Sequence, residues 1–379
     1  MIKRQSKIEK LISELCPKGV EFSELGKLTN IETGAQLNKT TLKESGEYPV
    51  LNGGINPSGY YHEYNTEENT IAISQGGASA GYVNFVTTKF WAGAHCFVVK
   101  PISNQVENRY LYFLLKNGQK KLQDAKSGAG IPGLNKKELQ NFKIPVPPLA
   151  IQEEIVKILN SFTELEAELE AELEARRKQY EHYRLKLLTF PEGGARWTTL
   201  GEICKAITAG GDLPNNFMKD QNISTKEFPY PIFSNGTESN ALYGYTDEYK
   251  IDEEAVTISA RGTIGHHAIR GAKFTPIVRL VTLIPNTKIV TTKFLNYVLD
   301  ITEIGHSGGS IPQLTVPNVK KIKIPVPSLE EQERVVLLLD KFDALINNIS
   351  IGLPAELKAR RSQYEYYRGE LLTFNEYAN

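Results

Sequence analysis

The chain carries one sixteen-residue segment twice, as ARRKQYEHYRLKLLTF at 175–190 and as ARRSQYEYYRGELLTF at 359–374, with twelve identical positions. Upstream, IPVPPLAIQEEIV at 144–156 matches IPVPSLEEQERVV at 324–336, an offset of 180 residues. Further matches join GVEFSELG to GARWTTLG, YPVLNGG to YPIFSNG, and SGAGIPGLN to SGGSIPQLT. Solenoid units repeat every ~20 to 50 residues, so this longer period indicates a tandem duplication of a whole domain with an appended element.

The appended element of each copy is predicted to be a long helix. After each IPVP motif, apolar and aromatic residues recur at spacings of three and four over residues 155–187 and 335–371, which is typical of a coiled-coil seam. A forty-residue helix is ~60 Å long, too long to bury in one small domain, so we expect the two helices to pack against each other antiparallel. Gly352 and Pro354 predict an interruption of the second helix.

The rest of each copy is predicted to mix strands and loops. Short β-branched runs such as IAISQGG and AVTISARG are punctuated by Gly, Pro and Asn, which is typical of strands joined by turns. The predicted fold class is α+β, with two tandem domains on curved sheets, two long helices and a pseudo-two-fold internal repeat. The expected boundaries are a first domain with an N-terminal helix at 1–150, a helix at 151–190, a second domain at 191–327 and a C-terminal helix at 328–379.

Composition narrows the class of protein. The 379 residues hold 44 basic and 44 acidic side chains, but the helical segments 151–190 and 328–374 carry net charges of −3 and −2, which leaves +5 on the remainder. This mild excess is compatible with a surface that faces nucleic acid. No apolar run approaches the ~18 residues of a membrane span and no signal peptide is recognisable, so we expect a cytoplasmic location. The three cysteines show no disulfide or zinc pattern.

The repeated segment also duplicates its charges. Packing of a helix seam explains the repeated tyrosines, and it is the simplest interpretation of the whole segment. A seam does not require identical arginines, however, so we predict that these arginines form a partner surface that occurs once in each half. The residues are Arg176, Arg177, Arg184, Arg360, Arg361 and Arg368.

The architecture resembles the specificity subunit of type I restriction-modification systems, because IPVPxLxxQ and ARRxQYExYRxxLLTF each follow a divergent domain. The resemblance covers the full chain. It implies that each domain reads one half of an asymmetric bipartite sequence in double-stranded DNA. It also implies that the helices set the spacer between the halves and dock two methyltransferase subunits, while restriction subunits join through the complex. The repeated LEAE tetrads at 164–175 fit the role of a spacer.

Two glycine-containing loops are the candidate DNA contacts, QGGASAG at 75–81 and ARGTIG at 260–265. Glycine allows close approach of the backbone to a ligand, and flanking polar side chains could bind base edges or phosphates. A purely structural turn is the alternative interpretation of both loops. The predicted DNA-binding residues are Gln75, Ser79, Lys126, Arg261, Thr263, His266, Arg270, Lys273 and Arg279.

The sequence lacks the motifs of an enzyme with its own chemistry. It contains no Asn/Asp-Pro-Pro-aromatic methyltransferase motif, no phosphate-binding GxxxxGK[ST] loop and no HExxH zinc motif. We therefore predict that the chain is non-catalytic by itself, and the resemblance implies that it is the recognition subunit of a complex with adenine-specific DNA methyltransferase and ATP-dependent endonuclease activity. S-adenosylmethionine, ATP and Mg²⁺ are expected on the partner subunits, and no cofactor or metal on this chain. The alternatives are a catalytic protein, and a coiled-coil scaffold or RNA-binding protein, which the near-neutral charge would suit.

Overall fold

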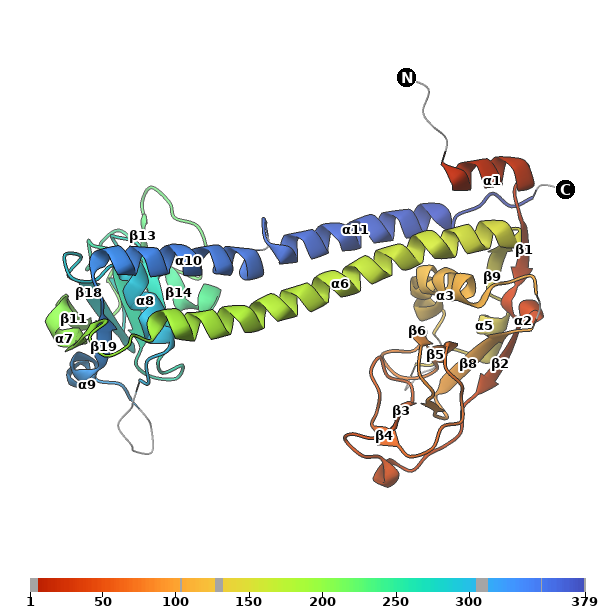
Figure 1. The fold of residues 1–379 in the computed structure, drawn as a ribbon, viewed down its shortest axis with the longest axis horizontal. Helices are drawn as coiled ribbons and strands as arrows, with labels where there is room; N and C mark the ends of the chain where they lie inside the picture. The colour runs from red at the N-terminus through yellow and green to blue at the C-terminus, as the bar shows by residue number, and fades with distance from the viewer. Residues whose placement is uncertain (1–5, 103, 127–131, 305–312, 349, 378–379) are drawn as a thin grey trace, which may run out of the picture. The chain divides into compact units, whose positions relative to one another are not determined.

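The chain divides into two compact units (Figure 1). Unit 1 comprises residues 1–170 and 356–379, and unit 2 comprises residues 171–355. The computed structural model describes residues 6–102, 104–126, 132–304, 313–348 and 350–377. The predicted matches SGAGIPGLN and SGGSIPQLT therefore lie partly outside the described residues.

Each unit is built on a four-stranded antiparallel sheet, with the order β2-β8-β5-β6 in unit 1 and β11-β18-β15-β16 in unit 2. The central strands β5 and β15 read TIAIS and AVTIS and are buried at all five positions, as expected for β-branched runs covered on both faces. The strands are β2 Thr29–Thr33, β5 Thr70–Ser74, β6 Val83–Val86 and β8 Cys96–Pro101, and β11 Cys204–Ala209, β15 Ala255–Ser259, β16 His267–Arg270 and β18 Leu280–Pro285.

Two smaller sheets complete each domain in the same way. A sheet that contains one parallel pair, β3·β7 or β13·β17, lies beside the four-stranded sheet, and a two-stranded ribbon joins the start of the domain to the strand before the long helix. In unit 1 these strands are β1 Glu21–Glu24, β3 Tyr48–Leu51, β4 Tyr60–Tyr61, β7 Trp91–Ala92 and β9 Lys143–Val146. In unit 2 they are β10 Arg196–Thr199, β12 Phe217–Lys219, β13 Tyr230–Phe233, β14 Leu242–Thr246, β17 Thr275–Pro276 and β19 Lys323–Val326.

Short helices cover one face of each four-stranded sheet. The amphipathic helices α3 and α8 bury an apolar face in the main core of their unit, which is the stable solution for a helix packed on a sheet. The short helices are α1 Lys7–Leu15, α2 Leu25–Leu28, α3 Asn108–Asn117, α4 Gln119–Asp124, α5 Lys136–Gln140, α7 Leu200–Ile203, α8 Thr292–Asp300 and α9 Val316–Lys321, with 3₁₀ turns at Lys39–Thr41 and Glu238–Ala241.

The long helices pair inside each unit. Helix α6 spans Leu149–Leu188, and α10 and α11 span Leu329–Asn347 and Leu353–Leu371. In unit 1, Phe162 of α6 stacks on Tyr367 of α11 at 5.6 Å between ring centroids, and Arg361 binds Glu166 and Glu170 further along α6. Along these contacts the residue numbers rise in α6 from 162 to 170 while they fall in α11 from 367 to 361, so the two helices run antiparallel there.

The same kind of seam joins α6 to α10 in unit 2. Phe342 stacks on Tyr183 with ring centroids 5.8 Å apart, and Tyr180 lies beside the same ring at 6.3 Å. Aromatic contacts of this type add ~0.5–1.5 kcal/mol beyond the area that they bury. The tyrosines of the repeated segment therefore pack in the helix pair, as the sequence predicts.

The second long helix is interrupted between Asn347 and Leu353, which confirms the prediction from Gly352 and Pro354. A Cβ atom at Gly352 would lie 2.5 Å from the carbonyl oxygen of Ala344 and 2.6 Å from that of Leu345. Only glycine fits this close approach of backbone to backbone.

We expect Gly352→Ala to lower the free energy of unfolding by about 1–3 kcal/mol, because the new methyl group would displace two carbonyl groups. Gly369 in α11 is a matched control, since a Cβ atom there meets nothing within 4 Å. Gly369→Ala should stabilise the helix by about 0.5–1 kcal/mol. Urea denaturation of both variants would measure the difference, and equal midpoints would contradict the prediction.

The predicted α+β class and the internal duplication are confirmed by this arrangement of elements. Among the described residues, no helix is long and apolar enough to cross a membrane.

Candidate functional site

A glycine loop follows the central strand of the sheet in unit 1. Ser74, the last residue of β5, donates its N–H to the carbonyl of Tyr82 at 3.0 Å and accepts from the N–H of Gly81 at 2.8 Å. The next residue, Gln75, donates its N–H to the carbonyl of His95 at 2.9 Å. These bonds fix both ends of the loop to the sheet and to the segment that enters β8.

The loop of unit 2 has the same hydrogen-bond pattern. Ser259 ends β15, donates to the carbonyl of His266 at 2.7 Å and accepts from Gly265 at 3.1 Å. Ala260 then donates to the carbonyl of Arg279 at 2.8 Å. The second loop is one residue shorter than the first, yet each of these bonds has its counterpart.

Glycines with positive φ stand at matching places in the two loops. Gly77 and Gly262 have φ of 74° and 77°, and Gly81 and Gly265 have φ of 86° and 85°. Left-handed backbone of this kind favours glycine. The glycines therefore have a structural reason, and the predicted alignment of the two loops is confirmed by their backbone geometry.

The structure brings three predicted residues of the first domain together. Gln75 and Ser79 are half-buried in the loop, and Lys126 reaches it from α4, with Nζ donating to the carbonyl of Ala78 at 3.3 Å. Ala78 itself is exposed. A cation is thus held at the rim of the loop, where it could contact a phosphate.

The predicted residues of the second loop are braced by neighbouring segments. Arg261 Nη2 donates to Gln313 Oε1 at 3.1 Å, while its Nε is buried without a partner among the described residues. Thr263 Oγ1 donates to the carbonyl of Asn235 at 2.6 Å, and Asn235 Nδ2 donates back to the carbonyl of Arg261. His266 is half-buried and closes the loop through its backbone.

The remaining predicted cations of the second domain lie in different surroundings. The Arg270 guanidinium lies 4.0 Å from the centroid of the Phe233 ring and donates to Thr257 Oγ1, and its burial lowers the pKa of this group. Lys273 is exposed at the turn after β16, with φ of 64°, and its Nζ lies 5.7 Å from the centroid of the Tyr249 ring. Arg270 therefore faces the sheet, whereas Lys273 faces solvent.

One residue at this site was missed by the sequence reasoning. His95 occupies in unit 1 the place that Arg279 occupies in unit 2, immediately before the strand β8 or β18. Both side chains are exposed. The two segments share no local motif, but each precedes a six-residue apolar strand that ends in proline, CFVVKP or LVTLIP, and that signal could have aligned them.

Five of the six predicted partner arginines make contacts inside their own units. Arg176 and Arg360 each bond a glutamate four residues earlier and a glutamine three residues later in the same helix. Arg361 binds two glutamates of α6, and Arg368 lies over the Tyr364 ring. Its counterpart Arg184 pairs with Glu181 and Asp300. Arg177 lines a cavity and has no ion-pair partner among the described residues.

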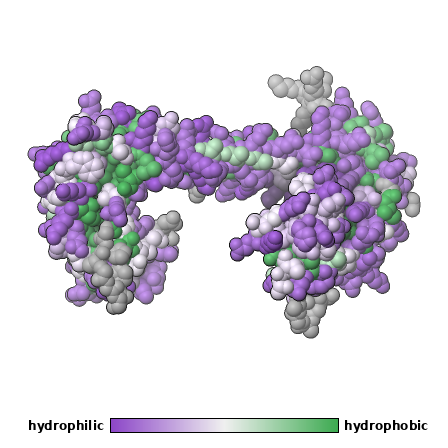
Figure 2. All heavy atoms as spheres, turned by 60° about the horizontal axis from the view of Figure 1, so that its bottom comes forward, coloured by the Kyte–Doolittle hydropathy of each residue, from purple (hydrophilic) through white to green (hydrophobic). Residues whose placement is uncertain are grey.

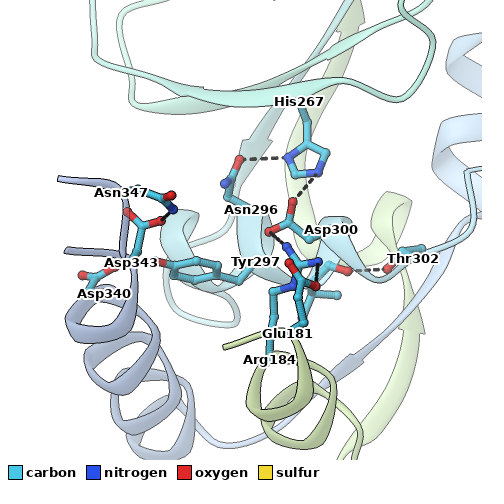
Figure 3. Close-up of polar contacts among 11 residues, drawn as sticks. Glu181, Arg184, His267, Asn296, Tyr297, Asp300, Thr302, Asp340, Asp343 and Asn347 are labelled. Atoms are coloured by element: carbon cyan, nitrogen blue, oxygen red, sulfur yellow. Dashed lines mark hydrogen bonds and ion pairs between the residues drawn. The ribbon is translucent and has the colours of Figure 1, made fainter. Parts of the chain in front are cut away.

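That cavity, of about 670 Å³, lies in unit 2 between α6, α8 and α10. Figure 3 shows Asp300 at its side, between His267 and Arg184, with separations of 3.5 Å to His267 Nε2 and 3.7 Å to Arg184 Nη1. Burial raises the pKa of Asp300, and the neighbouring His267 and Arg184 side chains oppose that shift. On the α10 side, Asp340 accepts hydrogen bonds from Tyr297 and Lys293 at 2.7 and 2.6 Å.

A second kind of cavity occurs once in each unit, with volumes of about 280 and 390 Å³. Both are lined by the ribbon Lys-Ile-Pro strand, by the Leu-Thr pair that ends the repeated segment, and by one aromatic residue of the ribbon's first strand. That aromatic residue is Phe22 in unit 1 and Trp197 in unit 2, where it is 62% exposed.

On the face drawn in Figure 2, hydrophilic residues predominate and hydrophobic ones gather in small separate patches.

Comparison with known proteins identifies the family. The family model described as "Type I restriction modification DNA specificity domain" matches the chain twice, over residues 17–175 and 196–359. The chain belongs to this specificity family. A specificity-family protein of Escherichia coli, the EcoR124I/EcoR124II specificity subunit, is 30% identical over an alignment of 413 residues that covers 97% of each chain.

Other relatives support the same assignment. A Haemophilus influenzae protein classed among type I restriction enzyme specificity subunits is 35% identical, over 94% of this chain and 96% of that protein. The crystal structure of a type I restriction-modification S subunit from M. genitalium has a TM-score of 0.58, covers 93% of this chain and 96% of its own, and is 22% identical. At that identity the structure shows the shared fold of the specificity family.

The chemistry of the site agrees with recognition. Within the described ranges, no group of three or more His, Cys, Asp or Glu side chains could hold a metal ion. The specificity-family loops present amide, hydroxyl, imidazole and guanidinium groups, which are hydrogen-bonding partners of bases and phosphates.

Proposed function

We propose that this chain reads an asymmetric bipartite sequence in double-stranded DNA as the specificity subunit of a type I restriction-modification complex. Each domain reads one half-site, and the long helices set the length of the non-specific spacer. The chain performs no catalysis itself. The methyltransferase subunits supply adenine methylation with S-adenosylmethionine, and restriction subunits that use ATP and Mg²⁺ join through the complex.

The observation that carries this proposal is the pair of loops with one backbone pattern and different side chains. Five backbone hydrogen bonds recur in both units, including those from Leu134 to Gln75 and from Leu314 to Ala260. The two loops have the same backbone geometry and carry different polar side chains. This arrangement suits a protein whose two domains approach DNA in the same way and read two different half-sites. The proposed contacts come from the loops and the exposed cations beside them, while Arg270 supports the sheet from within.

The proposed partner surface rests on the features that both units repeat. The ribbon cavities beside Phe22 and Trp197 share the lysine and proline of the ribbon strand and the Leu-Thr pair of the repeated segment, so each would take the same segment of one methyltransferase subunit. The arginines of the repeated segment flank the helix seam in both units. Arg177, which lines the larger cavity without an ion-pair partner among the described residues, is the arginine most available to a second chain.

The test is to express the chain with its methyltransferase subunits in a host without other adenine methylation and to map the methylated bases by single-molecule sequencing. A bipartite motif with a fixed spacer is the expected result. Filter binding of the purified chain to duplex DNA and to RNA would identify the alternative, an RNA-binding or scaffold protein, by equal or stronger retention of RNA.

Exchange of the first domain gives a sharper test. Replacing residues 20–143 with the corresponding domain of another specificity-family chain should change the first half-site and leave the second half-site and the spacer unchanged, because the replaced segment contains the loop, sheet and ribbon of unit 1 only. The methylation map of the chimera measures this. A chimera that alters both half-sites would contradict the separation of reading between the domains.

A further inference from the structure

One position in each unit joins the recognition loop to the strand beside it. His95 precedes β8 and Arg279 precedes β18, and the carbonyl of each accepts the N–H of the first loop residue, at 2.9 Å from Gln75 and 2.8 Å from Ala260. The backbone contact is therefore constant between the units, while the side chain above it is an imidazole in one and a guanidinium in the other.

The residues around this position are the same in unit 1 and unit 2 for structural reasons. Ser74 and Ser259 close the loops, and Gly81 and Gly265 share the same positive φ. A difference in side chain at an exposed point of an otherwise conserved frame has no effect on packing. The difference between His95 and Arg279 must then concern what the side chain meets outside the unit.

Arg279 is held in an unfavourable backbone conformation. Its φ is 75°, a region that costs a non-glycine residue ~1–2 kcal/mol, and such strain is concentrated at ligand sites. Its side chain is exposed and makes no hydrogen bond or ion pair with the described part of the chain. All five guanidinium donors are therefore available, whereas Arg261 in the adjacent loop already donates to Gln313.

His95 lies beside one glycine of its own loop, Gly76, and one of the segment after β3, Gly53. A Cβ atom at Gly76 would lie 3.9 Å from His95 Nδ1, and one at Gly53 would lie 3.2 Å from His95 Cβ. Larger residues at these glycines would cover the imidazole. The small neighbours keep the ring accessible from the loop side.

We propose that His95 and Arg279 are equivalent specificity-determining residues, each contacting one base pair of the half-site read by its domain, and that Arg279 binds guanine. The inference rests on the proposed function and names the residues that perform its readout. A guanidinium fork matches the O6 and N7 acceptors of guanine in the major groove, which is the commonest specific contact between a side chain and a base. The second half-site should therefore contain a G·C pair that depends on Arg279.

The experiment uses the full complex of this chain with its methyltransferase subunits and maps methylated sites for each variant. Arg279→Gly removes the fork and suits the positive φ, so the fold should be kept. We expect one G·C position of the second half-site to become degenerate, with discrimination at that position reduced roughly 5- to 100-fold, and the first half-site to stay unchanged. Arg279→Lys keeps the charge without the fork and should relax the same position.

Lys288→Ala is the control, because Lys288 is an exposed cation of the same domain that lies beyond the opposite end of β18 and is not among the proposed contacts. It should leave the motif unchanged. His95→Ala should relax one position of the first half-site only.

The outcomes separate the two levels of the proposal. If the unaltered chain directs no sequence-specific methylation, the proposed function and this inference both fall. If it does, and Arg279→Gly leaves the motif unchanged or relaxes the first half-site, the inference alone is overturned. Thermal unfolding of each variant beside the parent chain verifies that the domain is still folded.

Discussion

Replacing Gln152 with leucine is expected to destabilise unit 1 by several kcal/mol. Gln152 is fully buried near the start of α6, where Nε2 donates to the carbonyls of Gln105 and Pro147, both at 2.7 Å, and Oε1 accepts from the N–H of Glu107 at 2.9 Å. Leucine would remove the partner of one buried and two partly buried backbone groups, at up to ~1–3 kcal/mol for each group. This is a large part of the ~5–15 kcal/mol by which most domains are stable.

The internal repeat supplies a matched variant in unit 2. Gln332 is equally buried and bonds Thr291 N–H, Ile289 carbonyl and Pro327 carbonyl at 2.9, 2.9 and 3.0 Å. Gln332→Leu should therefore destabilise unit 2 by a similar amount. Exposed Glu153, next to Gln152 on α6, is the control, and Glu153→Leu should change stability by less than about 0.5 kcal/mol.

The two tryptophans allow the units to be followed separately. Trp91 lies in unit 1 and Trp197 in unit 2, so a Trp197→Phe background reports unit 1 and a Trp91→Phe background reports unit 2. In urea, Gln152→Leu should shift the transition seen by Trp91 more than that seen by Trp197, and Gln332→Leu the reverse. Equal shifts of both signals for either variant would show that the glutamines do not act locally.

These glutamines illustrate what the sequence could and could not predict. The motif IPVPxLxxQ occurs in both copies, and its periodicity places the glutamine at the start of a helix. Two of its three backbone partners in each copy lie 41 to 47 residues earlier in the chain, near Gln105 or Ile289. Periodicity reports which face of a helix is apolar, and it does not report which distant carbonyl needs a donor.

The long helices were predictable because their physics is local. A seam spacing of three and four residues, with Gly352 and Pro354 in the second copy, determines helix, stripe and interruption together. The role of Arg361 was not predictable in this way, because it pairs with Glu166 and Glu170, nearly two hundred residues earlier. Identical arginines in two copies can thus have different neighbours.

The candidate site was predictable only in part for a similar reason. The glycines of QGGASAG and ARGTIG predict the loops, because glycine adopts a positive φ more readily than other residues do. His95 was not predicted, because the loop binds its backbone carbonyl. A hydrogen bond to the backbone does not restrict which residue type occupies the position. Its equivalence to Arg279 became visible only through the shared hydrogen bonds.

Duplicating residues 169–172, the tetrad LEAE, is expected to lengthen the non-specific spacer of the DNA target by one or two base pairs. Helix α6 is unbroken from Leu149 to Leu188 and passes from unit 1 to unit 2 after Glu170. Four added residues lengthen it by ~6 Å and rotate its continuation by ~40°. DNA rises ~3.4 Å per base pair, so the added length corresponds to at most about two base pairs.

The structure indicates why the duplication should be tolerated. Glu166 lies before the duplicated tetrad and Glu170 lies in its first copy, so both contacts of Arg361 are kept. The seam continues, because a step of four residues is one further stutter in a three-and-four pattern. In the return connection, α10 ends at Asn347 and α11 begins at Leu353, and the described residues 348 and 350–352 between them are not helical. An extended residue spans up to ~3.3–3.6 Å against 1.5 Å in a helix, so this segment can supply the extra ~6 Å.

Methylation maps of three variants would test the spacer prediction. Duplication of the tetrad should lengthen the spacer, and deletion of residues 169–172 should shorten it by the same amount, with both half-sites kept. Inserting a single alanine after Glu170 is the control, because one residue rotates the helix by ~100° for only 1.5 Å of length and should disrupt the seam with α10 and lower methylation at all sites. A spacer that stays the same in the duplicated variant would mean that α6 serves partner docking alone, since a helix that sets the distance between two reading domains cannot gain a turn without moving them apart.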